Sequence, residues 1–193
     1  MKSFNLLDEP WIPCVRADGA CFDLGLAQVI DQAHELREVY EDSPLVTVAL
    51  HRLLLAVLHR AYGGPRRKAD WRALWEVGRF DTSVVGGYLQ QWAPRFDLLH
   101  PERPFYQCRD AEILEAKLHP ASALRQELAS GNNATLFDHG RIARFSLAEA
   151  ARALVAVQQF ALGGGVSKPF NCVMRRSSPA SWSTCAGKRS FRR

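Results

Sequence analysis

The sequence predicts an α+β fold that is mostly helical and begins with short β-strands and a hairpin. Two apolar runs, 11–16 and 21–24, flank Asp18-Gly19, a dipeptide typical of tight hairpin turns. Ser43-Pro44 precedes a long apolar segment and matches the preferred start of a helix. Ser146 and Glu149 form a capping box ahead of a second apolar segment. A further short strand is expected at residues 4–7.

Helices are predicted at 27–36, from Ser43 to about Tyr62, at 70–77, at 83–92, and from Ser146 to the glycines at 163–165. The helix from Ser43 carries apolar side chains on several sides, so we expect it to be central and mostly buried. Residues 95–108 hold three aromatic residues and two prolines, which predicts a packed segment without regular structure. Residues 119–144 are polar and predict a loop.

Composition excludes several classes of protein. With 193 residues, of which 47% are hydrophobic, the chain can fill a core. No apolar run reaches the roughly 20 residues of a membrane span, and the N-terminus lacks the apolar core of a signal peptide. Five cysteines without a C-x-x-C pair argue against zinc and redox motifs. Cys14 and Cys21 flank the hairpin and can face each other, although we favour two small strand residues in a reducing compartment. We expect a soluble cytoplasmic protein.

The positive charge is concentrated at the C-terminus. The chain has a net charge of +5, but residues 172–193 contain six basic residues and no acid. The first 171 residues therefore hold 19 basic and 20 acidic residues. Any contact of this near-neutral body with nucleic acid must be local.

No catalytic, metal or cofactor site is predicted. The sequence has no serine-nucleophile elbow, no H-E-x-x-H and no phosphate-binding P-loop. His51 and His59 lie eight residues apart on one predicted helix, two turns from each other, which is too far for two ligands of one metal.

The triple glycine at 163–165 is the first candidate contact site. A loop without Cβ atoms lets the backbone approach phosphate, sugar or a base edge, and Lys168 can neutralise a phosphate. The alternative, a helix C-cap with a flexible exit, stays equally open.

The loop 130–145 is the second candidate. Phe137, His139, Arg141 and Arg144 combine an aromatic ring with cations, which suits base stacking and phosphate contact. Composition alone favours a loop whose Phe137 is anchored in the core. A third group is basic and predicts a solvated linker rather than a contact with nucleic acid or an acidic partner. Its members are Arg60, Arg66, Arg67, Lys68 and Arg72.

Four segments stand in register along the chain: FNLLDEPWIPC at 4–14, RFDLLHPERPFYQ at 95–107, the loop from Asn133 to His139, and ALVAVQQFALGGGVSKPFN at 153–171. Together they resemble the CasA family, the large subunits of type I-E CRISPR Cascade complexes. The resemblance identifies 1–171 as a partial N-terminal CasA domain, and it implies that the rest of the family protein lies beyond Arg193.

The resemblance implies a non-enzymatic subunit that recognises the protospacer-adjacent motif (PAM) in double-stranded DNA and lies near the 5′ end of the guide RNA. Gly163, Gly164 and Gly165 would approach the minor groove at the PAM, with Lys168 as a phosphate contact. The implied partners are the other Cascade subunits, the CRISPR guide RNA, the target DNA, and a helicase-nuclease recruited through the full-length protein.

The second loop would contact the guide RNA next to the PAM. Its residues are Asn133, Phe137, His139 and Arg141. Phe137 matches a key phenylalanine of the family, whereas His139 stands where some members have asparagine.

Residues 172–193 depart from the family, which continues after Asn171 with an apolar strand. If the reading frame shifts near Asn171, one permitted set of codons encodes an apolar, strand-like run in place of this tail. We therefore predict that residues 172–193 are frameshifted and non-native. Two other interpretations remain. One is a fragment that assembles with Cascade subunits without recognising DNA, and the other is an unrelated hydrolase, for which the sequence has no set of catalytic residues.

Overall fold

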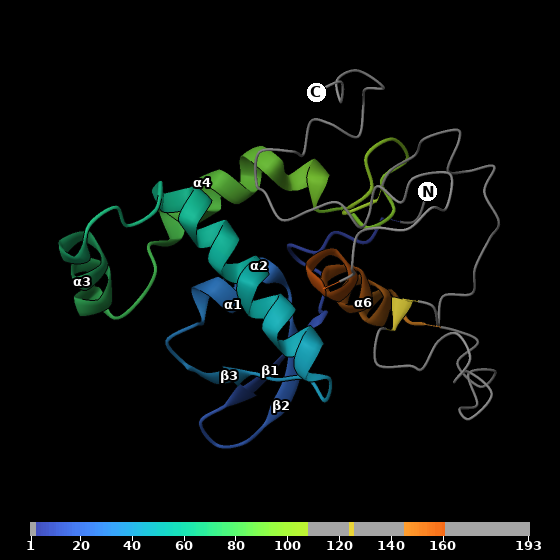
Figure 1. Cartoon of the computed structure of the whole chain (residues 1–193), viewed down its shortest axis with the longest axis horizontal. Helices are drawn as coiled ribbons and strands as arrows, with labels where there is room; N and C mark the ends of the chain where they lie inside the picture. The colour runs from blue at the N-terminus through green and yellow to red at the C-terminus, as the bar shows by residue number, and fades with distance from the viewer. Residues whose placement is uncertain (1–2, 108–123, 126–144, 161–193) are drawn as a thin grey trace, which may run out of the picture.

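The computed structural model describes residues 3–107, 124–125 and 145–160. In these residues a small antiparallel sheet lies beside a group of helices, as Figure 1 shows. The strand order is β2-β1-β3, with β1 at Ile12–Arg16, β2 at Cys21–Leu24 and β3 at Leu36–Val39. The helices are α1 (Leu26–Asp31), α2 (Pro44–Tyr62), α3 (Lys68–Val77), α4 (Thr82–Trp92), the 3₁₀ turn η1 (Ala93–Arg95) and α6 (Leu147–Phe160). The predicted α+β class is confirmed.

The predicted hairpin is present as β1 and β2. Asp18 accepts a hydrogen bond of 2.9 Å from the backbone N–H of Ala20. Gly19 adopts a φ of +86°, a left-handed conformation that glycine takes without steric cost. The turn chemistry of Asp18-Gly19 therefore fixes the point at which the chain reverses.

Cys14 and Cys21 do not face each other across this hairpin. Cys21 pairs with Val15, the neighbour of Cys14, so the two cysteines lie on opposite faces of the sheet. Cys14 is buried and Cys21 is exposed. Burial, with a smaller contribution from Asp23, raises the pKa of the Cys14 thiol to about 12, so this thiol stays protonated and is a poor nucleophile.

Residues 4–7 form a turn, so the strand predicted there is wrong. Leu6 and Leu7 are buried, but only Asn5 makes a strand-like bridge, to Asp97. The Leu6 N–H donates to the carbonyl of Phe96 at 2.9 Å. The apolar side chains of this run are thus buried in the core, and its backbone makes a few contacts with residues 96–98 but does not pair with a continuous strand.

The helix predicted at 27–36 is also partly wrong, because α1 ends at Asp31 and the strand β3 follows. Cys14 of β1 pairs with Val39 of β3, whose side chain is buried. The pairing of β3 with β1 determines the structure of this region, and the local pattern of apolar residues does not reveal such pairing.

α2 begins and ends where the sequence predicts. Ser43 is its N-cap and accepts a hydrogen bond from the N–H of Val46, and Pro44 occupies the first helical position. Gly63 follows the last turn with a φ of +71°, the left-handed cap conformation.

α2 is central but only one of its faces is buried, which corrects the expectation of a mostly buried helix. It packs against α4 and α6 through that face. On the other face Val48 and Leu55 are 49% and 54% exposed. Among the described helices, α2 alone is long and apolar enough to cross a membrane, a test that core helices of soluble proteins also pass. Its buried residues are Val46, Ala49, Leu50, Leu53 and Val57.

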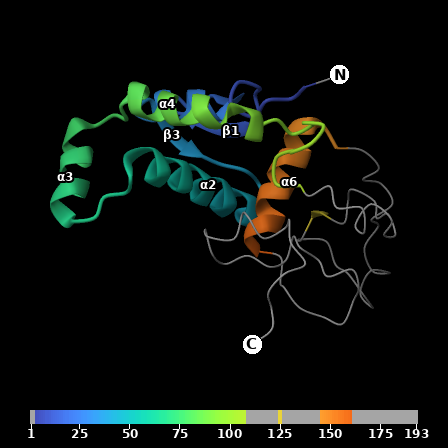
Figure 2. The same cartoon turned by 90° about the horizontal axis from the view of Figure 1, so that it is seen from above.

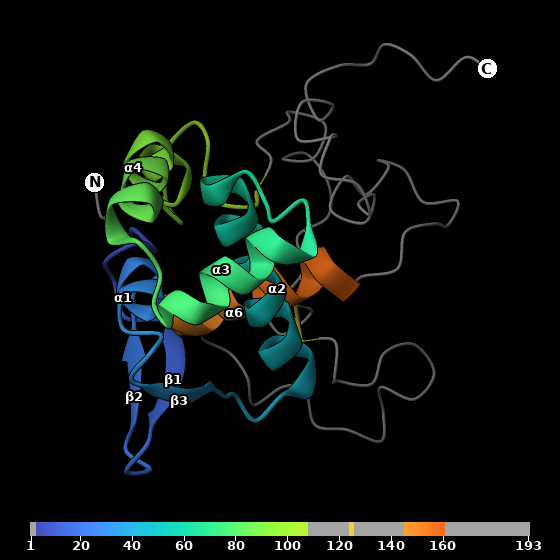
Figure 3. The ribbon, with the colours of Figure 1, turned by 90° about the vertical axis from the view of Figure 1, so that its left-hand side faces the viewer.

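The helices predicted at 70–77 and 83–92 are present as α3 and α4. Asp81 caps α4 by accepting hydrogen bonds from the N–H groups of Ser83 and Val84. α4 packs on α2 and buries Val85 and Leu89. α3 buries none of its residues, and Figure 1 shows it at the edge of the described structure. Figure 3, seen from that side, shows α3 in front of α2 and α6. α3 begins at Lys68, so part of the stretch predicted as a linker is helical.

The packed segment predicted at 95–108 is confirmed for its described residues, 95–107. Phe96, Leu98 and Phe105 are buried in the core. The Phe105 ring lies 5.9 Å from the Phe96 ring and meets the Trp11 ring edge-on at 6.5 Å. Edge and offset contacts of this kind are favourable for aromatic pairs.

α6 completes the described core. Figure 2 shows it crossing α2, with which it makes extensive contacts. Its buried residues are alanines and valines that lie on more than one side of the helix, and small side chains let two helices approach closely. The buried residues are Ala151, Ala153, Val155, Ala156 and Val157.

Asp97 joins the N-terminal residues to the 95–107 segment. Its carboxylate accepts hydrogen bonds from Ser3 Oγ (2.8 Å) and from the N–H groups of Phe4 (3.1 Å) and Leu99 (2.9 Å). Burial, the largest influence, raises the pKa of Asp97, but the hydrogen bonds together outweigh it and hold the pKa below its usual value. The resulting stabilisation is present above the unfolded-state pKa and is lost as pH falls through the folded-state pKa.

We expect Asp97→Asn to lower the free energy of unfolding by about 1–2 kcal/mol at neutral pH, because it removes a charged hydrogen-bond acceptor. The variant should also lose stability less steeply in acid than the wild-type chain does. Denaturant unfolding at a series of acidic to neutral pH values measures both effects. Glu9→Gln, at an exposed position, is the control. An acid dependence identical to that of the wild type would contradict the role of Asp97.

Candidate nucleic-acid interface

The residues predicted to contact nucleic acid all lie outside the described residues. In the first loop they are Gly163, Gly164, Gly165 and Lys168, and in the second they are Asn133, Phe137, His139 and Arg141. The structure describes the scaffold between these loops, which is α6. The chain enters α6 through Phe145 and leaves it after Phe160, three residues before Gly163. The placement of α6 therefore decides where the chain returns from the loop with Phe137 and where it departs toward the glycine loop.

The N-terminus of α6 has the predicted capping box. The Glu149 N–H donates to Ser146 Oγ at 3.2 Å, and the Ser146 N–H and hydroxyl donate to Glu149 Oε2 at 2.8 Å each. The two hydrogen bonds from Ser146 hold the pKa of Glu149 below its usual value. The bond from the Ser146 N–H has the larger effect, and the bond from its hydroxyl has the next largest. An ionised carboxylate in the first turn also interacts favourably with the helix dipole. The end of the 126–144 segment is thus fixed at a defined point.

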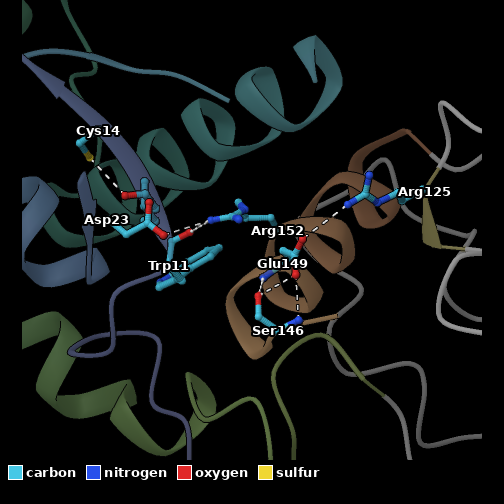
Figure 4. A network of polar contacts seen from close by, with 8 residues as sticks. Trp11, Cys14, Asp23, Arg125, Ser146, Glu149 and Arg152 are labelled. Atoms are coloured by element: carbon cyan, nitrogen blue, oxygen red, sulfur yellow. Dashed lines mark hydrogen bonds and ion pairs between the residues drawn. The ribbon is translucent and has the colours of Figure 1, made fainter. Parts of the chain in front are cut away.

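Arg125 brings the other end of that segment to the same point. Its Nη2 lies 3.6 Å from Glu149 Oε1, and its guanidinium lies 5.2 Å from the centroid of the Phe145 ring. Figure 4 shows Arg125 directed at Glu149 from outside α6. Arg125 and Phe145, the described residues on either side of 126–144, therefore meet at the N-terminus of α6. We call the contacts among Arg125, Phe145, Ser146 and Glu149 the loop base.

Arg152 fixes α6 to the sheet, one turn beyond the loop base. Its Nη1 donates to the carbonyl oxygen of Trp11 at 3.0 Å and lies 3.4 Å from Asp23 Oδ2 of β2. The Arg152 side chain is only 15% exposed. A largely desolvated guanidinium needs such partners, since a buried unpaired charge is costly. Figure 4 shows this arginine spanning the space between α6 and the hairpin.

The far end of α6 has an anchor of its own. Gln158 Nε2 donates to the carbonyl oxygen of Tyr106 at 3.1 Å, which ties the last turn to the packed segment 95–107. The helix has 14 residues and is about 21 Å long at 1.5 Å per residue. Leu147 and Phe160, the first and last residues of α6, are therefore held about this far apart.

The hollow beside the sheet does not suit nucleic acid. It is open, has a volume of about 610 Å³ and is lined by residues of β1, β2 and the segment after β3. Its charged lining residues are Asp23, Glu41 and Asp42, all acidic, which would repel phosphate. Among the described residues no group of three or more His, Cys, Asp or Glu side chains gathers as a metal site would require.

Sequence reasoning found the capping box but missed Arg125, Arg152 and Gln158. The sequence marks Arg152 in one way, because it is the single cation in α6. Nothing in the sequence marks Arg125 or Gln158, because each contacts a partner that is far away in the chain.

Comparison with known proteins agrees with the predicted family. A family model described as CRISPR-associated protein Cse1 matches residues 5–192. The CasA/Cse1 protein of Thermus thermophilus is 45% identical over 167 residues, which cover 85% of this chain and 33% of that protein.

Solved structures give the same result. The structure of Thermus thermophilus CasA (Cse1) has a TM-score of 0.73 at 39% identity and covers 87% of this chain and 33% of its own. Thermobifida fusca Cse1 has a TM-score of 0.74 at 36% identity, with 84% and 31% covered. A chain of a CRISPR RNA-guided surveillance complex has a TM-score of 0.70 at 29% identity, with 85% and 36% covered. This chain thus spans about a third of the length of its relatives, and it belongs to the CRISPR-associated CasA/Cse1 family.

Proposed function

We propose that this chain supplies guide-RNA and PAM contacts to a CRISPR RNA-guided surveillance complex, as a subunit without catalytic activity of its own. The observation that carries the proposal is the anchoring of α6 at three points, the loop base, Arg152 and Gln158. A contact site needs rigid support if its loops are to meet a nucleic acid in a fixed orientation. α6 supplies that support to both predicted loops at once.

In this proposal the two loops have different tasks. Gly163, Gly164 and Gly165 approach the minor groove of the PAM through their backbone, and Lys168 neutralises a phosphate. The loop with Asn133, Phe137, His139 and Arg141 contacts the 5′ end of the guide RNA, with Phe137 stacking on a base.

The proposed partners are the other Cascade subunits, the guide RNA and the target double-stranded DNA. A helicase-nuclease would be recruited through the full-length protein, of which this chain matches about a third. The same proposal places the complex in the cytoplasm, and residues 172–193 remain predicted as a non-native tail.

A second function is a fragment that assembles with other Cascade subunits without recognising DNA. The observation that favours it is the exposed face of α2, where Val48 and Leu55 are about half-exposed on a central core helix. Exposed apolar side chains on such a helix suit coverage by another part of an assembly.

PAM discrimination separates the two functions. Filter binding with PAM and non-PAM duplexes, with and without the other subunits, should show preference for the PAM duplex in the assembled complex. Gly164→Pro combined with Phe137→Ala should lower that preference by roughly tenfold, the loss expected for one to a few specific contacts. Unchanged preference in the double variant would show that the two loops are not the contact site.

The loop base gives a second prediction. Glu149→Ala removes both the cap and the partner of Arg125, so we expect weaker binding of guide RNA by the assembled complex, several-fold by titration, and a loss of about 1 kcal/mol of stability. Glu35→Ala, at an exposed position outside the loop base, is the matched control. Lower stability with unchanged RNA affinity would show that the loop base is structural only.

A further inference from the structure

α3 presents an aromatic pair that the fold does not use. The rings of Trp71 and Trp75 stack at 5.3 Å with an angle of 16° between their planes. Trp71 is 52% exposed and Trp75 is 72% exposed. No residue of α3 is buried, and Figures 1 and 2 both show the helix away from the sheet and from α6. Large exposed apolar groups that support no core are typical of binding surfaces.

Two cations share the face of these indoles. At 100° per residue, Lys68, Trp71, Arg72 and Trp75 fall within an arc of about 100° on α3. We call these four residues the tryptophan face. Lys68 and Arg72 are exposed, and neither makes an ion pair with an acid in the part of the chain that the structure describes.

The acids of α3 lie outside this face. Asp70 is engaged at the start of the helix, where its carboxylate accepts from the Arg67 N–H at 3.0 Å and pairs with the Arg67 guanidinium at 3.4 Å. Glu76 lies beyond the arc at the same 100° spacing. The tryptophan face therefore combines flat apolar rings with net positive charge, and further cations flank α3 at Arg66 and Arg79.

We propose that the tryptophan face binds single-stranded nucleic acid, with bases stacking on Trp71 and Trp75 and phosphates meeting Lys68 and Arg72. Every base offers a flat face to an exposed indole, and each successive phosphate carries a negative charge, so the ligand matches both components of the face. The site shares no residue with the two loops on either side of α6. It does not rest on the function proposed above, because it requires no partner subunit.

The alternation of rings and cations favours nucleic acid over an acidic protein. A protein partner that covered both indoles would also desolvate Lys68 and Arg72 between and beside them, and charged residues are depleted at the centre of protein interfaces. A nucleic-acid strand places its phosphates on the outside and keeps them hydrated while the bases stack. The cations can then act without burial.

The test uses the full chain and a short fluorescently labelled oligothymidylate, with an RNA strand of the same length as a second probe. We expect Trp71→Ala/Trp75→Ala to weaken binding roughly 5- to 100-fold, the range for loss of base stacking. Lys68→Gln/Arg72→Gln should reduce the slope of log affinity against log salt by about 1.4, from two phosphate contacts. Trp92→Ala, which removes a 40% exposed indole outside α3, is the matched control and should bind as the wild type does.

Two further measurements keep the outcome clear. Thermal melting of Trp71→Ala/Trp75→Ala should match the wild type, because both side chains are exposed, so weaker binding cannot be attributed to unfolding. Polyglutamate is the second competitor. If it displaces the oligonucleotide at equal charge concentration and the tryptophan variant binds normally, binding rests on charge without base stacking and the proposal is overturned. Equal binding by wild type, tryptophan variant and charge variant would overturn it as well.

Discussion

Trp11 occupies the point at which four parts of the chain meet. Its side chain is fully buried, and its Nε1 donates to the carbonyl of Leu6 at 2.8 Å. Its backbone N–H donates to Leu24 of β2, and its carbonyl accepts from Arg152 of α6. The indole also meets the ring of Phe105. A single residue thus links the N-terminal turn, the sheet, the aromatic segment and α6, and the placement of both predicted loops depends on that link.

The elements that the sequence predicts correctly are those that begin or end at a local turn or capping motif. Asp18-Gly19 reverses the hairpin, Ser43-Pro44 starts α2, and Ser146 with Glu149 starts α6, each through bonds made within a few residues. Strand β3 differs from the prediction because its partner is β1, and residues 4–7 differ because their backbone partners lie at 26–27 and at 96–98. Non-local pairing decides both regions, and a local pattern is compatible with either outcome.

The same division applies to the candidate site. The capping box of α6 was readable, but the meeting of Arg125 with Glu149 and of Arg152 with Trp11 required the fold. The sequence also does not show which face of α2 is exposed, because its leucines are distributed around the helix. The packing of α4 and α6 determines which side is buried. The helix that carries Trp71 and Trp75 is predicted at 70–77, but its start at Lys68 and the stacking of the two indoles required the fold.

The length of α6 decides how one helix can serve two loops. Its two ends are about 21 Å apart, which corresponds to about six base pairs of B-DNA at 3.4 Å each. In the proposed function, segments attached to the two ends of α6 would reach different parts of one nucleic-acid assembly, such as a guide strand and an adjoining duplex. The near-neutral charge of residues 1–171 fits this arrangement, because local contacts held at fixed separation give register without a broad basic surface. In the proposed function, α6 is held by the loop base at its N-terminus, by Arg152 near its middle and by Gln158 in its last turn, and this fixed position would supply the orientation that net charge cannot.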